Sequence, residues 1–261
     1  MTSGYSTKEN WTGLISFTHR NVRRMIRVSA QTLLAPWVTA VLYIFVFGSV
    51  VGVRIGPVQG FSYVDFVLPG IVMMNVIMSA FADASSNLFM QRFTRSVEEV
   101  LVAPFSYFEM IIGFAVSGIF RGFIVGVGVY ALALLFTSAG VLHFWLFALY
   151  IFAIATIFSF VGMAVGIMSS HFEHVSLLNT FVIMPLIFLG GVFNSVSMLP
   201  PALQTIVSVN PFFYFVDGIR FAMLGFHESN LAVGALIIVF LTLSSGFLVW
   251  YFFKTGYRIR E

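Results

Sequence analysis

Six apolar stretches, each long enough to cross a bilayer, constrain this chain more than any other feature. The sixth stretch, Met110–Ser138, is interrupted only by Arg121, and the other five contain no Asp, Glu, Lys or Arg: Val28–Val53, Phe66–Ala82, Phe144–Met168, Val175–Phe193 and Leu231–Phe253. A helix rises about 1.5 Å per residue, so such stretches can cross a hydrocarbon core of roughly 30 Å. Charged residues make up 9% of the chain, against about a quarter in a typical soluble domain. We predict an all-α membrane protein with six transmembrane helices, over residues 30–53, 64–90, 107–138, 143–168, 175–194 and 231–253.

The distribution of basic residues sets the predicted orientation. If the N-terminus lies in the cytoplasm, ten of the 13 Lys and Arg residues fall on the cytoplasmic side, and only Arg54 and Arg220 fall outside. Cytoplasmic loops carry an excess of Lys and Arg, so both termini are expected in the cytoplasm, with an even number of crossings. Residues 1–261 would then form a single multi-pass domain. The ten residues are Lys8, Arg20, Arg23, Arg24, Arg27, Arg92, Arg95, Lys254, Arg258 and Arg260.

Residues 200–226 could be mistaken for a seventh span, but three features argue against a crossing. Pro211 lies in the middle of the segment, Asp217 and Arg220 lie in its second half, and the number of crossings must be even. The pair Pro200–Pro201 forces an extended entry. We predict two short re-entrant helices between the fifth and sixth spans, on the outer side, where protein or water must cover the non-helical backbone. Asp217 and Arg220 are three residues apart and can pair on one helix face.

The N-terminal segment, residues 1–29, has the pattern of a helix that lies in the cytoplasmic interface. At about 100° per residue, its arginines fall on one face and its large apolar side chains on the other. Such a helix can anchor to anionic lipid or dock a cytoplasmic partner, and the two roles are compatible. The basic face carries Arg20, Arg23, Arg24 and Arg27, and the apolar face carries Leu14, Phe17, Val22, Met25, Ile26 and Val28.

Several kinds of site lack the residues that they require. The chain has no cysteine, so it can form neither disulfides nor thiolate metal ligands. A phosphate-binding loop needs a lysine after a glycine, and neither Lys8 nor Lys254 follows one. His171 and His174 lie in a short turn without a second cluster to complete a metal site. We expect no cofactor site in this chain, no enzyme activity of its own and no nucleic-acid binding, because basic residues beside a membrane already explain its charge.

Two charged side chains, Asp83 and Arg121, are expected at membrane depth. Charges are costly there, so they pair, line water or take part in function. Asp83 lies toward the inner end of the second span and Arg121 deeper in the third, which would let the long arginine reach the carboxylate. A structural ion pair, a contact along a water-lined path and a proton relay are the three interpretations.

The loop between the second and third spans carries the sequence RSVEEVLVAP, with two adjacent carboxylates. Ser96 with Glu99, and Ser106 with Glu109, have the spacing of capping boxes. We therefore predict a short helix over residues 96–104 on the cytoplasmic face, with Glu99 as part of its cap. Glu98 would be exposed.

Taken together, these elements resemble the ABC-2 type exporter permeases. The resemblance rests on EEVLVAPFSYFEMIIG (Glu98–Gly113), on LGGVFNSVSMLPPALQTIVSVNPFFYFVDGIRFAMLG (Leu189–Gly225) and on GFSYVDFVLPGIVMM (Gly60–Met74), and it covers essentially the whole chain. It implies a bacterial inner-membrane homodimer bound to two copies of a separate ATPase, which holds ATP and Mg. The substrate would be a lipid-like, glycan or drug-like molecule moved outward.

The resemblance also implies roles for named residues. Residues 96–104 would be the coupling helix that sits in a groove of the ATPase, the N-terminal helix would be a second contact, and the re-entrant helices would close the outer end of the path. The implied ATPase-coupling residues are Arg95, Glu98, Glu99, Val100, Leu101, Arg20, Arg23 and Arg24, and the implied external gate residues are Pro200, Pro201, Pro211, Phe212, Phe213, Tyr214, Asp217 and Arg220.

Two other classes of protein compete with this interpretation. An ion- or proton-coupled secondary transporter would have inverted repeats with interrupted helices near the middle of the bilayer, together with titratable residues there. Only Asp83 meets that description. A membrane scaffold without transport activity would need no more than the apolar surface.

Overall fold

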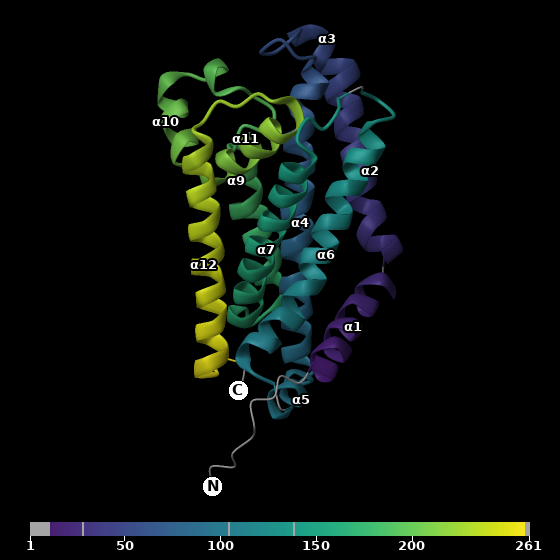
Figure 1. Ribbon diagram of the computed structural model, residues 1–261, viewed down its shortest axis with the longest axis vertical. Helices are drawn as coiled ribbons and strands as arrows, with labels where there is room; N and C mark the ends of the chain where they lie inside the picture. Colours follow the sequence, from purple (N-terminus) through teal and green to yellow (C-terminus); the bar gives the residue numbers. More distant parts are fainter. Residues whose placement is uncertain (1–10, 28, 104, 138, 259–261) are drawn as a thin grey trace.

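The computed structural model describes residues 11–258 except 28, 104 and 138, and these residues form helices joined by loops, without a strand (Figure 1). The first half contains α1 (Trp11–Arg27), α2 (Ser29–Phe45), α3 (Gly52–Ile55), α4 (Tyr63–Phe93), α5 (Val97–Val102) and α6 (Tyr107–Ala133). The second half contains α7 (Phe144–Met168), α8 (Phe172–Leu178), α9 (Met184–Phe188), α10 (Pro201–Val209), α11 (Pro211–Leu224) and α12 (Leu231–Thr255). Parts of three predicted elements, at residues 1–10 and 28, at Pro104 and at Ser138, lie outside the described residues.

Five helices in the described part are long and apolar enough to cross a membrane. They are the continuous run Thr32–Ile55 and the helices α4, α6, α7 and α12. The prediction of an all-α protein with several apolar spans is therefore confirmed. The third span is shorter than expected, since α6 ends at Ala133.

The segment predicted as the fifth span is a shorter apolar helix, Phe172–Phe188, in which a π-helical turn at Asn179–Ile183 separates α8 from α9. Just before this helix, Arg92 at the end of α4 donates to the carbonyl of Ser169, at 3.2 Å. Near its other end, Asn210 donates to the carbonyl of Leu186, at 2.7 Å. The segment therefore runs from the α5 end of the bundle to the α11 end.

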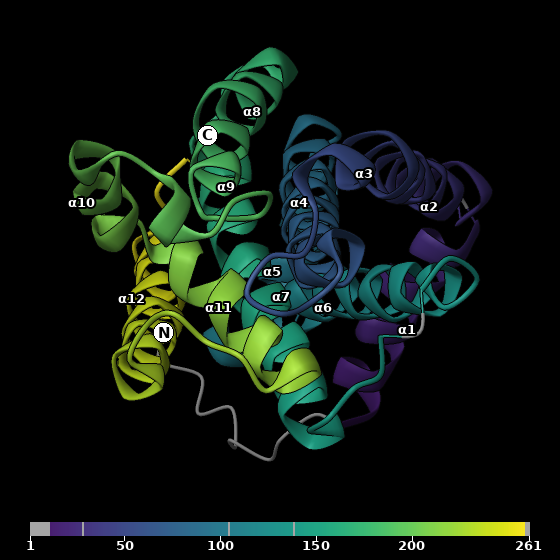
Figure 2. The same ribbon diagram turned by 90° about the horizontal axis from the view of Figure 1, so that it is seen from above.

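Helix α4 is the centre of the bundle and packs most extensively against α7 and α6. Glycines make these close approaches possible: a Cβ on Gly162 of α7 would lie 2.7 Å from the carbonyl oxygen of Phe81 in α4, and one on Gly118 of α6 would lie 3.0 Å from that of Ala80. Seen from above, α2 and α12 lie on opposite sides of this core (Figure 2). Both leave most of their apolar surface uncovered within one copy of the chain.

The two ends of the bundle carry different elements. Helices α1 and α5 and the end of α12 lie at one end, while α3, α10 and the start of α12 lie at the other (Figure 1). The described part of the chain therefore begins and finishes at the same end. This is the arrangement that an even number of crossings would produce.

Helix α1 packs against protein with part of the face that its amphipathic pattern assigned to lipid. Phe17 and Met25 are buried, and the Phe17 ring meets that of Phe114 edge-on, with centroids 5.0 Å apart. Asn21, between them on the same face, is also buried and donates to the carbonyl of Gly113 in α6 at 2.9 Å. Ile26, assigned to the same apolar face, stays half exposed. The amphipathic pattern located the helix correctly. It did not show which apolar side chains face the protein and which remain exposed.

Candidate functional site

Helix α5 lies across the end of the bundle between α4 and α6. Val97 and Val100 are buried among apolar side chains of α1, α4 and α6, whereas Glu98 and Glu99 are exposed. Leu101 is half-buried beside them. Val100, which the resemblance implies as a contact with the partner, is 3% exposed and anchors α5 to its own chain.

The start of α5 does not use the predicted capping box. Ser96 has helical dihedral angles, and its side chain caps no helical N–H group. Its hydroxyl lies 2.6 Å from the hydroxyl of Thr94 instead. The cause is Arg95, whose φ of 57° makes a tight left-handed turn and directs the Ser96 side chain back toward α4. The assignment of Glu99 to a cap is therefore also wrong.

The second predicted capping box, at the start of α6, is confirmed. The Ser106 hydroxyl accepts from the Glu109 backbone N–H at 3.2 Å, and the Glu109 carboxylate accepts from the Ser106 N–H at 2.7 Å. The cap fixes the direction in which the chain enters the span after α5.

A charged hollow of about 300 Å³ borders the exposed side of α5. Arg92, Arg95, Glu98 and Arg258 line it. Arg92 also donates to the carbonyls of Gly166 and Ser169 at the end of α7, at 3.0 and 3.2 Å, where a cation complements the helix dipole. The hollow thus carries charges of both signs, a surface suited to receiving polar side chains from another protein.

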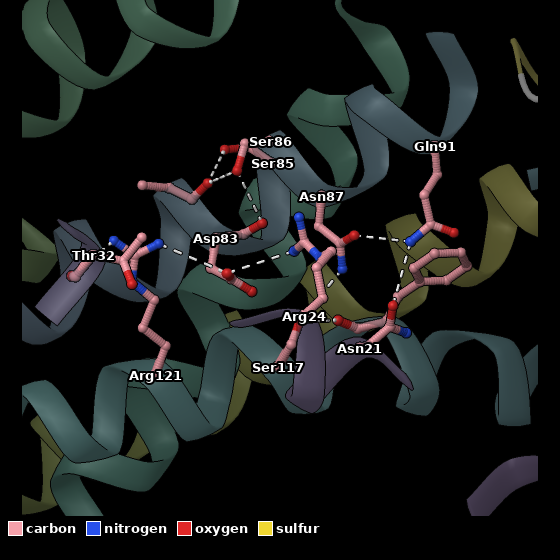
Figure 3. A network of polar contacts seen from close by, with 12 residues as sticks. Asn21, Arg24, Thr32, Asp83, Ser85, Ser86, Asn87, Gln91, Ser117 and Arg121 are labelled. Atoms are coloured by element: carbon pink, nitrogen blue, oxygen red, sulfur yellow. Dashed lines mark hydrogen bonds and ion pairs between the residues drawn. The ribbon is translucent and has the colours of Figure 1, made fainter. Parts of the chain in front are cut away.

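Asp83 and Arg121 lie together, as in the ion-pair interpretation, and are part of a larger network (Figure 3). Asp83 of α4 is 4% exposed and lies 3.7 Å from Arg121 of α6. It also lies 3.6 Å from Arg24 of α1, a contact that the sequence analysis missed. Arg121 in addition donates to the carbonyl of Thr32 in α2, at 3.1 Å. One carboxylate therefore joins α1, α4 and α6, and Arg121 extends this link to α2.

The same face of α4 continues the polar network toward α5. Gln91 donates to the side-chain oxygens of Asn87, at 2.8 Å, and of Asn21 in α1, at 3.3 Å. Asn87 in turn lies 3.4 Å from the hydroxyl of Ser117 in α6. Positions 83, 87 and 91 are four residues apart, so they share a helix face, and this spacing is the signal from which the network could have been predicted.

At the opposite end, Asp217 and Arg220 form the predicted pair, at 3.9 Å, and both side chains are fully buried. Asp217 accepts from the backbone N–H groups of Glu228 and Ser229, both at 2.8 Å, and from the Ser229 hydroxyl at 2.6 Å. Both of these residues belong to the loop between α11 and α12, so the carboxylate fixes that loop to α11.

Arg220 has further partners that the sequence analysis missed. Its guanidinium lies 3.6 Å from the Glu228 carboxylate and 4.0 Å above the Phe66 ring, and it donates to the carbonyl of Gly191 at 2.8 Å. Glu228 sits in the loop between α11 and α12. Its partners are distant in sequence, so no local pattern indicates them.

The other residues assigned to an external gate are packed within the protein to different degrees. Pro201 and Pro211 open α10 and α11, a position where proline fits a helix, whereas Pro200 is exposed. Phe212 and Phe213 are buried, and the Phe212 ring contacts Phe158 of α7 with centroids 5.4 Å apart. Tyr214 donates to the carbonyl of Ser208 at 2.9 Å and so links α11 to α10. In this conformation the aromatic side chains fill the space between α11 and α7.

Comparison with known proteins adds a family and several relatives. Residues 12–224 match the family described as ABC-2 type transporter. The inner membrane transport permease YadH of Escherichia coli strain K12 is 37% identical over 252 residues, which cover 96% of this chain and 98% of that relative. Nodulation protein J of Rhizobium leguminosarum bv. viciae is 27% identical over 236 residues, or 88% of each chain. Nodulation protein J of Rhizobium meliloti is 28% identical over 233 residues, or 87% of each chain.

Proposed function

Because the chain belongs to the ABC-2 type transporter family, we propose that it is the permease subunit of an ATP-driven exporter that works as a homodimer with two copies of a separate ATPase. Family membership makes it a transport permease of an ABC transporter and a multi-pass inner-membrane protein. The partner, the copy number and the outward direction are the proposed parts. ATP and Mg would be held by the ATPase.

The observation that carries the proposal is the geometry of α5. A short helix crosses the end of the bundle, anchored by two buried valines, with Glu98 and Glu99 exposed and a charged hollow beside them. Since α5 is packed against α1, α4 and α6, a force applied to it would be transmitted to several helices at once. We assign α5 as the coupling helix, with Arg95, Glu98, Glu99 and Leu101 as its contact residues.

Helix α1 supplies a second proposed contact with the ATPase. Arg20 and Arg23 are exposed at the same end of the bundle as α5, and Arg24 is connected through Asp83 to α4. This end carries most of the Lys and Arg residues, which supports a cytoplasmic location and cytoplasmic termini.

The uncovered apolar faces support a homodimer within lipid. On α2, Leu34, Val38 and Leu42 are each more than half exposed and recur every fourth residue, and Phe181 in the segment 172–188 is 71% exposed. We propose that segment 172–188 crosses the membrane as the fifth of six spans, and that the first and fifth spans form the interface between two copies. Substrate would pass between the protomers.

The buried cluster at the α11 end supports a closing role for α10 and α11. Asp217 and Arg220 fix α11 to the loop before α12 and to Gly191, and Tyr214 links α11 to α10, at the outer end of the proposed path. We assign α10 and α11 as re-entrant helices that separate to release a lipid-like, glycan or drug-like substrate. In the alternative, a proton-coupled secondary transporter, Asp83 would carry protons, yet it is held between two arginines.

The coupling assignment is tested by replacing Glu98 and Glu99 together with alanine. Both side chains are exposed, so the fold should be unaffected, while ATPase co-purification and the ATP hydrolysis of the purified complex should both fall. Glu173→Ala is the matched control, because it removes an exposed carboxylate at the start of α8, near the same end. If the double variant retains both properties at the level of the control, α5 is not the coupling helix.

A further inference from the structure

A second hollow, separate from the one beside α5, lies between α1 and the turn that joins α4 to α5. It has a volume of about 540 Å³ and is lined by His19, Arg20, Arg23 and Arg24 from α1, and by Gln91 and Ser96 from the other side. Figure 3 shows Arg24, Asn21 and Gln91 side by side where α1 meets α4. We call this hollow the α1 basic pocket.

Positive charge in the α1 basic pocket is not balanced by the residues around it. Asp83 is the carboxylate paired with Arg24, and it is shared with Arg121. Among residues whose placement is described, no carboxylate pairs with Arg20 or Arg23, and both side chains are exposed. Three guanidinium groups on one wall repel one another and attract an anion.

The chemistry of the lining suits a phosphate group. Guanidinium groups present planar, paired donors that match phosphate oxygens, and charge-assisted hydrogen bonds of this kind are the strong ones. Neutral polar groups from α4 and the α4–α5 turn complete the wall. Gln91 lines this wall and is held there by the hydrogen bonds that it donates to Asn87 and Asn21.

The position of the pocket fits a lipid headgroup as one source of this phosphate. Ile15 and Ile26 of α1 are 64% and 53% exposed, so the helix presents apolar as well as basic side chains on its surface. Apolar side chains and basic side chains on different sides of one helix are typical of helices at a membrane surface, where anionic headgroups lie.

We propose that the α1 basic pocket is a binding site for a phosphate group, supplied by an anionic phospholipid headgroup or by a soluble phosphate. Because Ser96 immediately precedes α5, an occupied pocket would connect α1 to the start of α5. The site does not depend on the proposed ATPase partner, and binding can be measured on the purified chain alone.

The test is native mass spectrometry of the purified chain in neutral detergent, titrated with phosphatidylglycerol, with phosphatidylcholine or with inorganic phosphate. The variants are Arg20→Gln with Arg23→Gln, the same pair changed to lysine, and Lys254→Gln as the control. Lys254 is exposed at the end of α12 and lies outside the pocket, so its replacement lowers the net charge without changing the lining, and its one ring contact, with Trp250, lies within α12.

We expect the first phosphatidylglycerol to bind roughly tenfold more weakly to the double glutamine variant, because charge-assisted contacts are lost. The lysine pair should recover part of this loss, and Lys254→Gln should match the unchanged chain. Arginine-dependent binding of phosphatidylglycerol alone identifies a headgroup site, and the same dependence for inorganic phosphate identifies a soluble anion.

Two results would overturn the proposal. One is equal affinity of the double glutamine variant and the unchanged chain for phosphatidylglycerol and inorganic phosphate. The other is an unchanged anion affinity accompanied by loss of ATPase co-purification, which would assign the arginines to the protein interface instead. If Glu98 and Glu99 prove not to bind the ATPase, the phosphate site in the α1 basic pocket is unaffected. The coupling proposal and the phosphate-site proposal can therefore be refuted independently.

Discussion

Replacing Arg220 with methionine should destabilise the protein by about 3–5 kcal/mol, the cost of removing one partner from a buried ionic cluster. The arginine is fully buried and connects two carboxylates, the Phe66 ring and the carbonyl of Gly191. Methionine fills much of the same volume, so the cost comes from the carboxylates of Asp217 and Glu228, which would lose their cation.

The remaining hydrogen bonds of the cluster indicate which second substitution should restore part of the lost stability. Asp217 keeps three donors when Arg220 is absent, and Glu228 keeps the Ser195 hydroxyl and the backbone N–H of Val196. Adding Glu228→Gln to Arg220→Met removes one of the two unpaired charges. The double variant should therefore be more stable than Arg220→Met alone.

The free energy of unfolding can be followed by near-ultraviolet circular dichroism in mixed micelles of SDS and a neutral detergent. Arg54→Met is the control, because Arg54 is exposed at the same end of the bundle. A loss below about 1 kcal/mol for Arg220→Met, comparable to an exposed ion pair, would refute the view that this cluster fixes α11.

Three further changes test the packing, the caps and the network at membrane depth. Gly162→Ala would place a methyl group 2.7 Å from a carbonyl oxygen of α4 and should cost about 1–3 kcal/mol in the same assay, whereas Gly140→Ala, with nothing within 4 Å, should be neutral. Ser106→Ala should cost about 1 kcal/mol through loss of a capping box, and Ser96→Ala, which removes no cap, should cost less than half of that. Asp83→Asn should release α1, seen as faster proteolysis within Trp11–Arg27, and unchanged protection of that segment would contradict the role of the Arg24 contact.

Much of the architecture follows from the sequence because membrane helices are specified by local patterns. The apolar runs predicted five spans that the structure contains, and the spacing of Ser106 and Glu109 predicted a real cap. A pair of Asp83 with Arg121 was one of three interpretations of the sequence, because two isolated charges at similar depth in neighbouring helices have few other partners.

Long-range packing explains what the sequence analysis missed. The burial of Phe17 depends on Gly113, which leaves room for its ring on a helix about a hundred residues away. The contact of Glu228 with Arg220 depends on a loop that returns to α11. At Ser96 the capping pattern was present, but the left-handed turn at Arg95 turned the serine side chain away from the helix.

Among the residues proposed to contact the ATPase, some features could be predicted from the sequence and others could not. Exposure of Glu98 and Glu99 was predictable from their charge, and it makes them available to a partner. The burial of Val100 was not, because a six-residue helix has no periodicity long enough to show which apolar residue faces inward.

The central claim is that two copies of this chain act with two copies of a separate ATPase. Native mass spectrometry of the tagged chain, purified in neutral detergent from membranes that also contain its ATPase, tests it most directly. The account predicts a complex of two permease and two ATPase chains, which loses the ATPase chains when Glu98 and Glu99 are replaced with alanine. A chain that never retains an ATPase, or a complex that is indifferent to both glutamates, would contradict it.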